Sequence, residues 1–272
     1  MRKIFLLSFL ILPFFVKAQL NDISARAIAL GGSGQTLVSP WAAYYNQANL
    51  PLLADKITAG IFYNGFLSIP GLSDKALTFA YKFTDNNTIA LDFISSGIDV
   101  YNTQKLGIAY GQKIANNFYL GGQINLHRLN QPDYYGDIYT ATGEVSFLYI
   151  NRDITGIERL ALGARAFNFT YGLLDKYQPV ILNLGLNIDF TKKAGFFAET
   201  QLASDNPLII RWGAMYRPVS AISLMVGGYL QNNIYTITFG TGIKYRWIRL
   251  NFGFESHPLR GMSGAAGIVL GI

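Results

Sequence analysis

YTITFGTGIKYRWIRLNFGFE, from Tyr235 to Glu255, alternates large apolar side chains with small or polar ones, and this alternation decides the fold. The apolar positions are Tyr235, Ile237, Phe239, Ile243 and Tyr245, followed by Ile248, Leu250, Phe252 and Phe254. Successive side chains of a β-strand point to opposite faces of the sheet. A period of two therefore predicts two strands joined by a tight turn.

The same period recurs along most of the chain. In residues 182–190, for example, Leu, Ile and Phe alternate with Asn, Gly and Asp. Counting such segments between turn signals gives about 14 strands. We expect them to begin near Ile57, Lys75, Thr88, Lys105, Asn117, Tyr139, Glu158, Pro179, Ala194, Leu208, Ala221, Asn233, Ile248 and Met262.

The composition favours a membrane environment for these strands. Charged residues make up 14% of the chain, whereas a soluble domain has roughly 25%. After residue 18 no apolar run is long enough for a spanning helix. Strands can cross lipid only as a closed barrel, because every backbone group must be paired internally. We predict an all-β fold, a transmembrane antiparallel β-barrel of about 14 strands; a soluble all-β protein is the alternative that alternation alone leaves open.

Details of the strand ends bear on orientation. An even number of strands puts both ends of the wall on one side, and the shorter connections, after the even-numbered strands, mark that side as periplasmic. Paired glycines in the wall leave room for a gap in a strand, at Gly121 with Gly122 and at Gly227 with Gly228. Aromatic residues suited to the interfacial girdles are Tyr216, Tyr229, Tyr235, Tyr245 and Trp247.

Residues 1–18 have the pattern of a secretory signal peptide. Arg2 and Lys3 precede an apolar run, and "VKA" ends at Ala18 like a cleavage site. We therefore divide the chain into a signal peptide (1–18), an N-terminal plug segment (19–55) and a barrel (56–272). Without the leader, 19 of the 22 basic residues remain against 16 acidic ones, a net charge of +3 that gives no support to a nucleic-acid partner. The absence of cysteine excludes a disulfide framework.

The plug is expected inside the barrel, because 14 strands enclose more space than their own side chains fill. The stretch "ISARAIALGG", residues 23–32, has helical spacing that stops at Gly31 and Gly32. The stretch "WAAYYNQANLP", residues 41–51, favours neither a long helix nor a strand. We expect Trp41 to wedge against the wall and the amides of Asn46 and Gln47 to satisfy backbone groups in a turn.

This N-terminal stretch resembles the FadL-like outer-membrane barrels, and within them the PorV/PorQ-type proteins of the type IX secretion system. Their pattern is ARA-x-A-L/M-GG followed by A-x-x-x-N-P-A-x-L. The matching residues are Ala25, Arg26, Ala27, Ala29, Leu30, Gly31, Gly32, Ala43, Asn46, Ala48 and Leu50. Gln47 stands where the family pattern has proline, and Trp41 is the remaining residue of the expected plug motif.

The resemblance implies a 14-stranded barrel in the outer membrane of a Gram-negative bacterium, with its N-terminal segment folded into the lumen. It implies a non-enzymatic component or partner in protein secretion or surface attachment. The alternative is a FadL-like channel for the uptake of hydrophobic small molecules. The partners to expect are outer-membrane lipid, a secretion-system or surface protein, and a hydrophobic ligand.

Catalytic and metal chemistry finds little support in the sequence. His127 and His257 have no motif neighbour that would make a nucleophile and base, and ligands at metal-binding spacing are missing. "GGSGQ", starting at Gly31, lacks the Lys-Ser/Thr and the preceding strand of a phosphate loop. We expect no cofactor, no metal and no enzymatic activity.

Basic residues on the inward register are the candidate binding site. They are Arg159, Arg165, Arg211, Lys244, Arg246 and Arg249. As an arc in the lumen they would favour an anionic ligand or an acidic segment. The alternative is that they pair with Asp92, Glu144, Glu199 and Glu255, or with Asp22 and Asp55 of the plug, and hold the barrel together.

Overall fold

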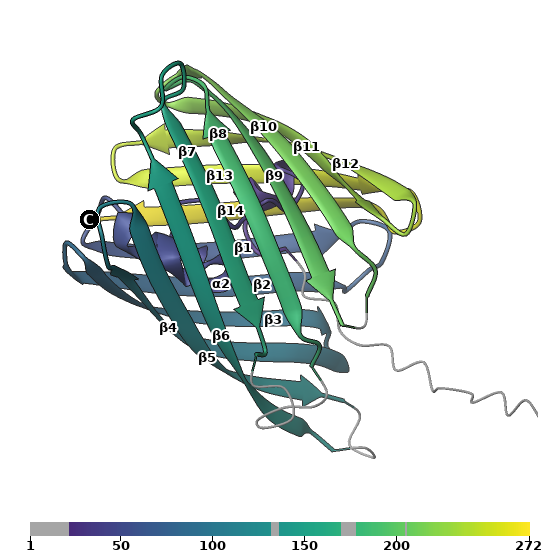
Figure 1. Ribbon diagram of the computed structural model, residues 1–272. Coiled ribbons are helices and arrows are strands. Elements are labelled where there is room, and N and C mark those ends of the chain that lie inside the picture. The colour runs from purple at the N-terminus through teal and green to yellow at the C-terminus, as the bar shows by residue number, and fades with distance from the viewer. Residues whose placement is uncertain (1–21, 132–135, 170–177, 205) are drawn as a thin grey trace, which may run out of the picture.

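A computed structural model describes residues 22–131, 136–169, 178–204 and 206–272 (Figure 1). The proposed signal peptide lies outside these ranges. The strands are β1 (Ile57–Phe66), β2 (Ser73–Thr84), β3 (Asn87–Ile98), β4 (Tyr101–Lys113), β5 (Phe118–Asn130), β6 (Ile138–Asn151), β7 (Arg159–Phe167), β8 (Ile181–Asp189), β9 (Ala194–Ala203), β10 (Ile209–Val219), β11 (Ile222–Gln231), β12 (Ile234–Tyr245), β13 (Ile248–His257) and β14 (Gly261–Gly271). None of the helices among these residues is both long and apolar enough to cross a membrane.

The 14 strands form one closed antiparallel barrel, as the sequence predicts. Each strand pairs with its neighbours in the chain, and β1 pairs with β14 from Thr58 opposite Gly271 to Phe66 opposite Ser263. The predicted strand starts agree with the observed ones to within four residues. The largest difference is at β4, which begins at Tyr101 instead of Lys105 because the polar residues 101–104 pair with β3 although they lack apolar alternation.

The terminal end of the barrel is where β1 begins and β14 ends, and it carries the connections after the even-numbered strands. The loop end is the opposite one. Strand pairing is interrupted in register at two places among the described strands, between Lys82 and Thr84 and between Tyr216 and Val219, both near the terminal end. The second interruption includes Pro218, which has no N–H to donate.

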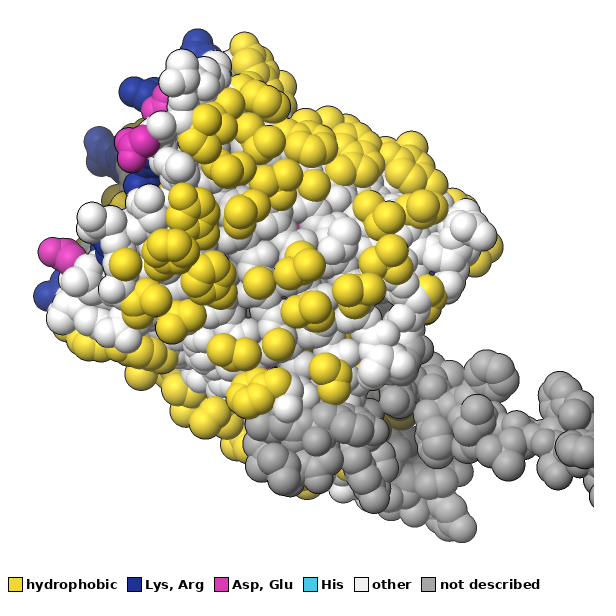
Figure 2. All heavy atoms as spheres, in the orientation of Figure 1, with side chains coloured by type: hydrophobic (Ala, Val, Ile, Leu, Met, Phe, Trp, Pro, Cys, Tyr) yellow, Lys and Arg dark blue, Asp and Glu magenta, His cyan; other side chains and the backbone are white. Residues whose placement is uncertain are grey.

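The outer face of the wall is apolar. Ile61, Ile124 and Ile237 expose 57%, 66% and 52% of their surfaces, and similar side chains alternate outward along the other strands. Figure 2 shows these side chains over the wall, with Lys, Arg, Asp and Glu gathered at the end where the C-terminus lies. Apolar patches on soluble monomers rarely exceed a few hundred Å², so a surface of this kind belongs in lipid.

One aromatic residue expected in the girdles faces the other way. Tyr229 is buried inside the barrel, where its hydroxyl donates to Glu255 Oε1 at 3.0 Å. Gly227 and Gly228 precede it, and the alternation places Met225, Gly227 and Tyr229 on the inner face. The girdle interpretation was wrong for Tyr229 because it directly follows a glycine pair, and glycines, which lack side chains, do not indicate which face the next residue occupies.

Residues 22–56, called the inner segment below, lie inside the barrel (Figure 1). It contains the helices α1 (Ala25–Ala29) and α2 (Ala42–Tyr45) and the 3-10 helix η1 (Gln47–Leu52). The helical spacing at 23–32 is confirmed, and the chain turns away at Gly31 and Gly32 with φ of 70° and 81°. Residues 41–51 form one turn of α-helix and most of the short 3-10 helix. The segment's apolar side chains and those of the inner wall make a shared core around Ile28, Leu30, Trp41, Phe62, Phe197 and Met225.

Candidate functional site in the lumen

Glycines on the inner wall bring the inner segment close to the strands. A Cβ added to Gly213 would lie 2.7 Å from Leu30 O, and one added to Gly227 would lie 2.6 Å from Leu30 C. Gly121 faces Gln47 and Ala48 in the same way. Strand pairing continues on both sides of Gly121 and Gly227. These glycines therefore accommodate the inner segment, and they do not open the gap in the wall that the glycine pairs suggested.

Gln47 links the inner segment to buried charges of the wall. Its Nε2 lies 2.8 Å from Ala43 O, 2.8 Å from Glu144 Oε2 and 3.1 Å from Gln123 Oε1. Glu144 also forms a salt bridge with Arg165 at 2.6 Å. A proline at this position would offer no donor. The departure from the family pattern at Gln47 thus supplies a hydrogen-bond donor to a buried carboxylate.

Two further motif residues fix the same turn. Asn46 Oδ1 accepts a hydrogen bond from the Ala48 amide at 3.0 Å and its Nδ2 donates to Phe147 O at 3.1 Å. It therefore caps η1 and attaches it to β6. Trp41 packs edge-on against Phe62, with ring centroids 5.9 Å apart, and contributes to the core as expected.

Tyr44 of α2 lies between two cations of the wall. Lys105 Nζ is 4.7 Å and the Arg165 guanidinium carbon 5.8 Å from the centre of its ring. Lys105 pairs with Asp92 at 2.8 Å, and Asp92 accepts a further bond from Gln123 at 2.7 Å. Burial raises the pKa of the Tyr44 hydroxyl well above its usual value, so the ring stays neutral and offers both cations a π face.

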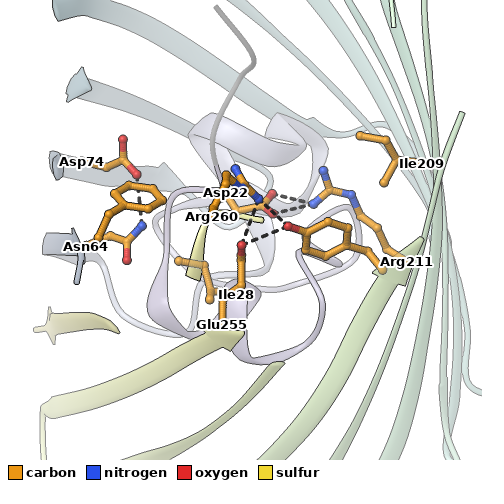
Figure 3. Close-up of a pocket in the computed structure, with 10 residues that line it drawn as sticks. Asp22, Ile28, Asn64, Asp74, Ile209, Arg211, Glu255 and Arg260 are labelled. Atoms are coloured by element: carbon orange, nitrogen blue, oxygen red, sulfur yellow. Dashed lines mark hydrogen bonds and ion pairs between the residues drawn. The ribbon is translucent and has the colours of Figure 1, made fainter. Parts of the chain in front are cut away.

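At the loop end, the lumen narrows to a small polar pocket (Figure 3). Arg211 binds Asp22 of the inner segment at 2.6 Å, and Arg260 binds Glu255 at 2.9 Å and the Tyr229 hydroxyl at 2.6 Å. The pocket measures about 30 Å³, which is room for water and for nothing larger. In this arrangement the ion pairs block entry into the lumen from the loop end.

At the terminal end, a wider cavity of about 420 Å³ lies between the inner segment and the wall. Of the six predicted basic residues, Arg159 and Arg249 line it, and Lys244 lines an adjoining cavity with Arg249. Arg159 pairs with Asp189, and Arg249 pairs with Asp55, each at 2.8 Å. These three residues form the part of the predicted arc that the structure brings together.

The other predicted basic residues lie elsewhere. Arg165 and Arg211 are buried in salt bridges with Glu144 and Asp22. Arg246 is not on the inward face: it occupies the β12–β13 turn with φ of 51° and packs against the Tyr245 ring at 5.4 Å. Strand β12 ends one residue earlier, so the alternation that placed Arg246 inward no longer applies.

Sequence reasoning missed two cations of the terminal end, Arg152 and Arg217. Arg217 lies six residues after Arg211 on β10 and so shares its inward register. That spacing was the available signal. Arg152 follows the end of β6 in a turn, where strand alternation gives no information.

The two histidines have local roles. His127 Nε2 lies 2.8 Å from Thr142 Oγ1, and His257 Nδ1 accepts bonds from the Leu259 and Arg260 amides, both at 3.1 Å. Within the part of the chain that the structure describes, no three His, Asp or Glu side chains gather in a way that could hold a metal ion.

A closed antiparallel barrel of 14 strands with an apolar outer face, and with a folded segment inside, is the architecture of a transmembrane β-barrel. It is similar to the toluene transporter TodX of Pseudomonas putida, with a TM-score of 0.68 and 11% identity over 93% of this chain and 98% of that one. A FadL homologue of Pseudomonas aeruginosa aligns with a TM-score of 0.61 and 10% identity over 92% and 97%. A TodX deltaS2S3 mutant, named a monoaromatic hydrocarbon channel, aligns with a TM-score of 0.63 and 12% identity over 90% of this chain and 96% of that one. The sequence itself matches no protein-family profile and no curated protein.

Proposed function

We propose that this protein is an outer-membrane channel for small hydrophobic molecules, exported by a cleaved signal peptide, with the inner segment as its plug. The observation that carries the proposal is the apolar core that fills the middle of the lumen, around Ile28, Leu30, Trp41 and Phe197. A hydrated pore for polar solutes would need a continuous polar path. A solute that displaces part of this core must itself be apolar to avoid a desolvation cost.

The similar solved structures support the same function. TodX is a toluene transporter, and its fold covers nearly the whole of this chain. In the proposed orientation the loop end faces the outside and the terminal end faces the periplasm. Passage then requires the inner segment to shift, because the loop-end pocket of about 30 Å³ is smaller than any such solute.

The motif residues have defined roles in this proposal. Gly31 and Gly32 turn the chain between α1 and the wall, while Asn46, Gln47 and Ala48 attach η1 to β5 and β6. Trp41 packs into the core. Together they hold the plug at several points around the barrel, so that it can move in part without leaving the lumen.

Uptake by whole cells tests the proposal. A Gram-negative host that expresses the full chain should take up toluene faster than the same host without it, with no change in the uptake of glycerol. A Gly213→Leu variant, whose side chain would collide with Leu30, should admit both solutes. Gly264→Ala is the matched control, because its added Cβ meets only Phe254 at an ordinary 3.6 Å. Toluene uptake unchanged by expression would contradict the proposal.

A role in protein secretion or surface attachment is the second candidate. It is favoured by the N-terminal resemblance to PorV/PorQ-type proteins and by connections as short as the two residues between β3 and β4 and between β11 and β12, which leave the rim accessible to a partner. Affinity purification of the full chain from outer membranes should then recover a secretion-system or surface protein. Recovery of none, together with toluene uptake, would leave the channel as the function.

A further inference from the structure

The charged residues that line the cavity at the terminal end are five arginines and one aspartate, beside residues 36–38 of the inner segment. Arg26 comes from α1 of the inner segment, and the wall contributes Arg152, Arg159, Arg217, Arg249 and Asp189. An adjoining cavity of about 160 Å³ adds Lys244 to the same surroundings. The cations come from the inner segment, from four strands and from one turn, so the fold and not one local sequence brings them together.

The carboxylates nearby are already engaged. Asp189 binds Arg159, and Asp55 binds Arg249, each at 2.8 Å. Arg26 donates to Met215 Sδ at 3.7 Å, and Arg217 donates to Lys192 O at 3.3 Å. Among the residues that the structure describes, no carboxylate forms a salt bridge with Arg26, Arg152, Arg217 or Lys244.

The surroundings of Arg26 disfavour its positive charge. Burial, and then repulsion by Arg217 and Arg159, lowers its pKa to about 10; attraction by Asp189 offsets part of this effect, and Arg249 adds a smaller repulsion. The guanidinium therefore stays protonated at neutral pH while it faces three other positive charges. An anion in the cavity would relieve this repulsion.

We propose that this cavity binds a small dianion through carboxylate or phosphate oxygens, with Arg26 and Arg217 as its principal donors. Guanidinium groups bind such oxygens in a bidentate manner, and several converging arginines suit a ligand with two charges. A volume of about 420 Å³ fits a small molecule. The site lies at the terminal end of the lumen beside the core residue Leu37, and its proposed ligand is anionic, unlike the apolar solute of the proposed channel.

The position of Arg26 allows a bound ligand to connect the inner segment to the wall. Arg26 belongs to the inner segment, whereas Arg217 and Arg249 belong to β10 and β13. A dianion bound between them joins the plug to the wall. Ligand binding then stabilises the closed arrangement, because a ligand that favours one state shifts the population towards it.

Calorimetric titration of the purified full-length protein in a nonionic detergent, with inorganic pyrophosphate as the probe, tests the site. We expect saturable binding to one site, weakened about tenfold or more by Arg26→Gln and by Arg217→Gln, a tenfold change corresponding to about 1.4 kcal/mol. Arg128→Gln is the matched control: it removes the same charge at the loop end of β5, where Arg128 pairs with Asp137. It should bind within about twofold of the unmodified protein.

A change of electrophoretic mobility on heating verifies that each variant is a folded barrel. If one of the two arginine variants fails to fold, the other still tests the site. Three outcomes overturn the proposal: no saturable binding of pyrophosphate, equal weakening by Arg128→Gln, or unchanged binding in both cavity variants. A fourth is binding of an acidic peptide in place of pyrophosphate, which would make the cavity a protein-docking site.

Discussion

The two ends of the lumen use the same residue type in different ways. At the loop end, Arg211 and Arg260 each face a carboxylate, Asp22 and Glu255, and the pocket between them measures about 30 Å³. At the terminal end, Arg26 and Arg217 face other arginines across an open cavity. An inward arginine is therefore a structural element where an acid lies opposite and a candidate binding group where none does. Inward orientation alone does not distinguish the two.

Removing an arginine from the paired end should have the largest effect. Arg211→Gln leaves Asp22 without its cation and removes the bond from Nη1 to Gly32 O. Breaking a buried pair costs about 3–5 kcal/mol, and because the Asp22 side chain is 18% exposed, we expect a loss near the lower limit, about 3 kcal/mol. Urea unfolding in lipid vesicles, followed by tryptophan fluorescence, measures it. A loss below about 1 kcal/mol would mean that this pair behaves as a surface one.

Displacing α1 should disturb the ion pair at the loop end of the lumen and the cavity at its terminal end together. In a Gly213→Leu variant the new leucine side chain is excluded by Leu30, so α1, which carries Arg26 and follows Asp22, must move. Overpacking of this kind typically costs about 1–3 kcal/mol. We expect the unfolding midpoint to fall and pyrophosphate binding to weaken in the same variant. If stability falls while binding is unchanged, the two ends do not depend on one segment.

Gln47→Pro tests an attachment remote from both ends. It restores the residue of the family pattern and removes the donor to Glu144 and Gln123. Leaving a buried acceptor with fewer partners costs about 1–3 kcal/mol, and the remaining bonds of Glu144 to Arg165 and Asn125 favour the lower part of that range. Gln131→Ala, at an exposed bond to Gly136 O, is the control. Equal stability of the two variants would show that the Gln47 bonds contribute nothing.

Arg26→Gln should have the smallest effect on stability. The change removes a cation that repels its neighbours and breaks no salt bridge. We expect the free energy of unfolding to stay within about 0.5 kcal/mol of the unmodified protein, as for other substitutions without a defined structural role. A loss comparable to that of Arg211→Gln would contradict the difference between the two ends.

The wall could be predicted from the sequence because its determinants are local. Alternation within each strand, as in residues 235–255, fixes which side chains face lipid, and turn residues such as Asn232 and Asn233, with φ of 51° and 61°, fix where strands reverse. Tyr229 and Arg246 were misplaced where the alternation is weak: Tyr229 directly follows a glycine pair, and Arg246 lies just beyond a strand end.

The contacts inside the lumen could be predicted only in part. Helical spacing located α1, and charge identified Arg159 and Arg249. The partners of Gln47, however, lie 76 and 97 residues away on β5 and β6, and no local sequence pattern specifies these long-range contacts. Whether an inward arginine is paired depends on the position of the inner segment against each strand, which the sequence period does not encode.

Single-channel recording in planar lipid bilayers tests most directly the claim that the inner segment closes the lumen. The full-length protein should show small and brief conductance steps, because apolar core and ion pairs occupy the lumen. The Gly213→Leu variant should show larger and longer ones. A stable, porin-like open conductance from the unmodified protein would contradict the account.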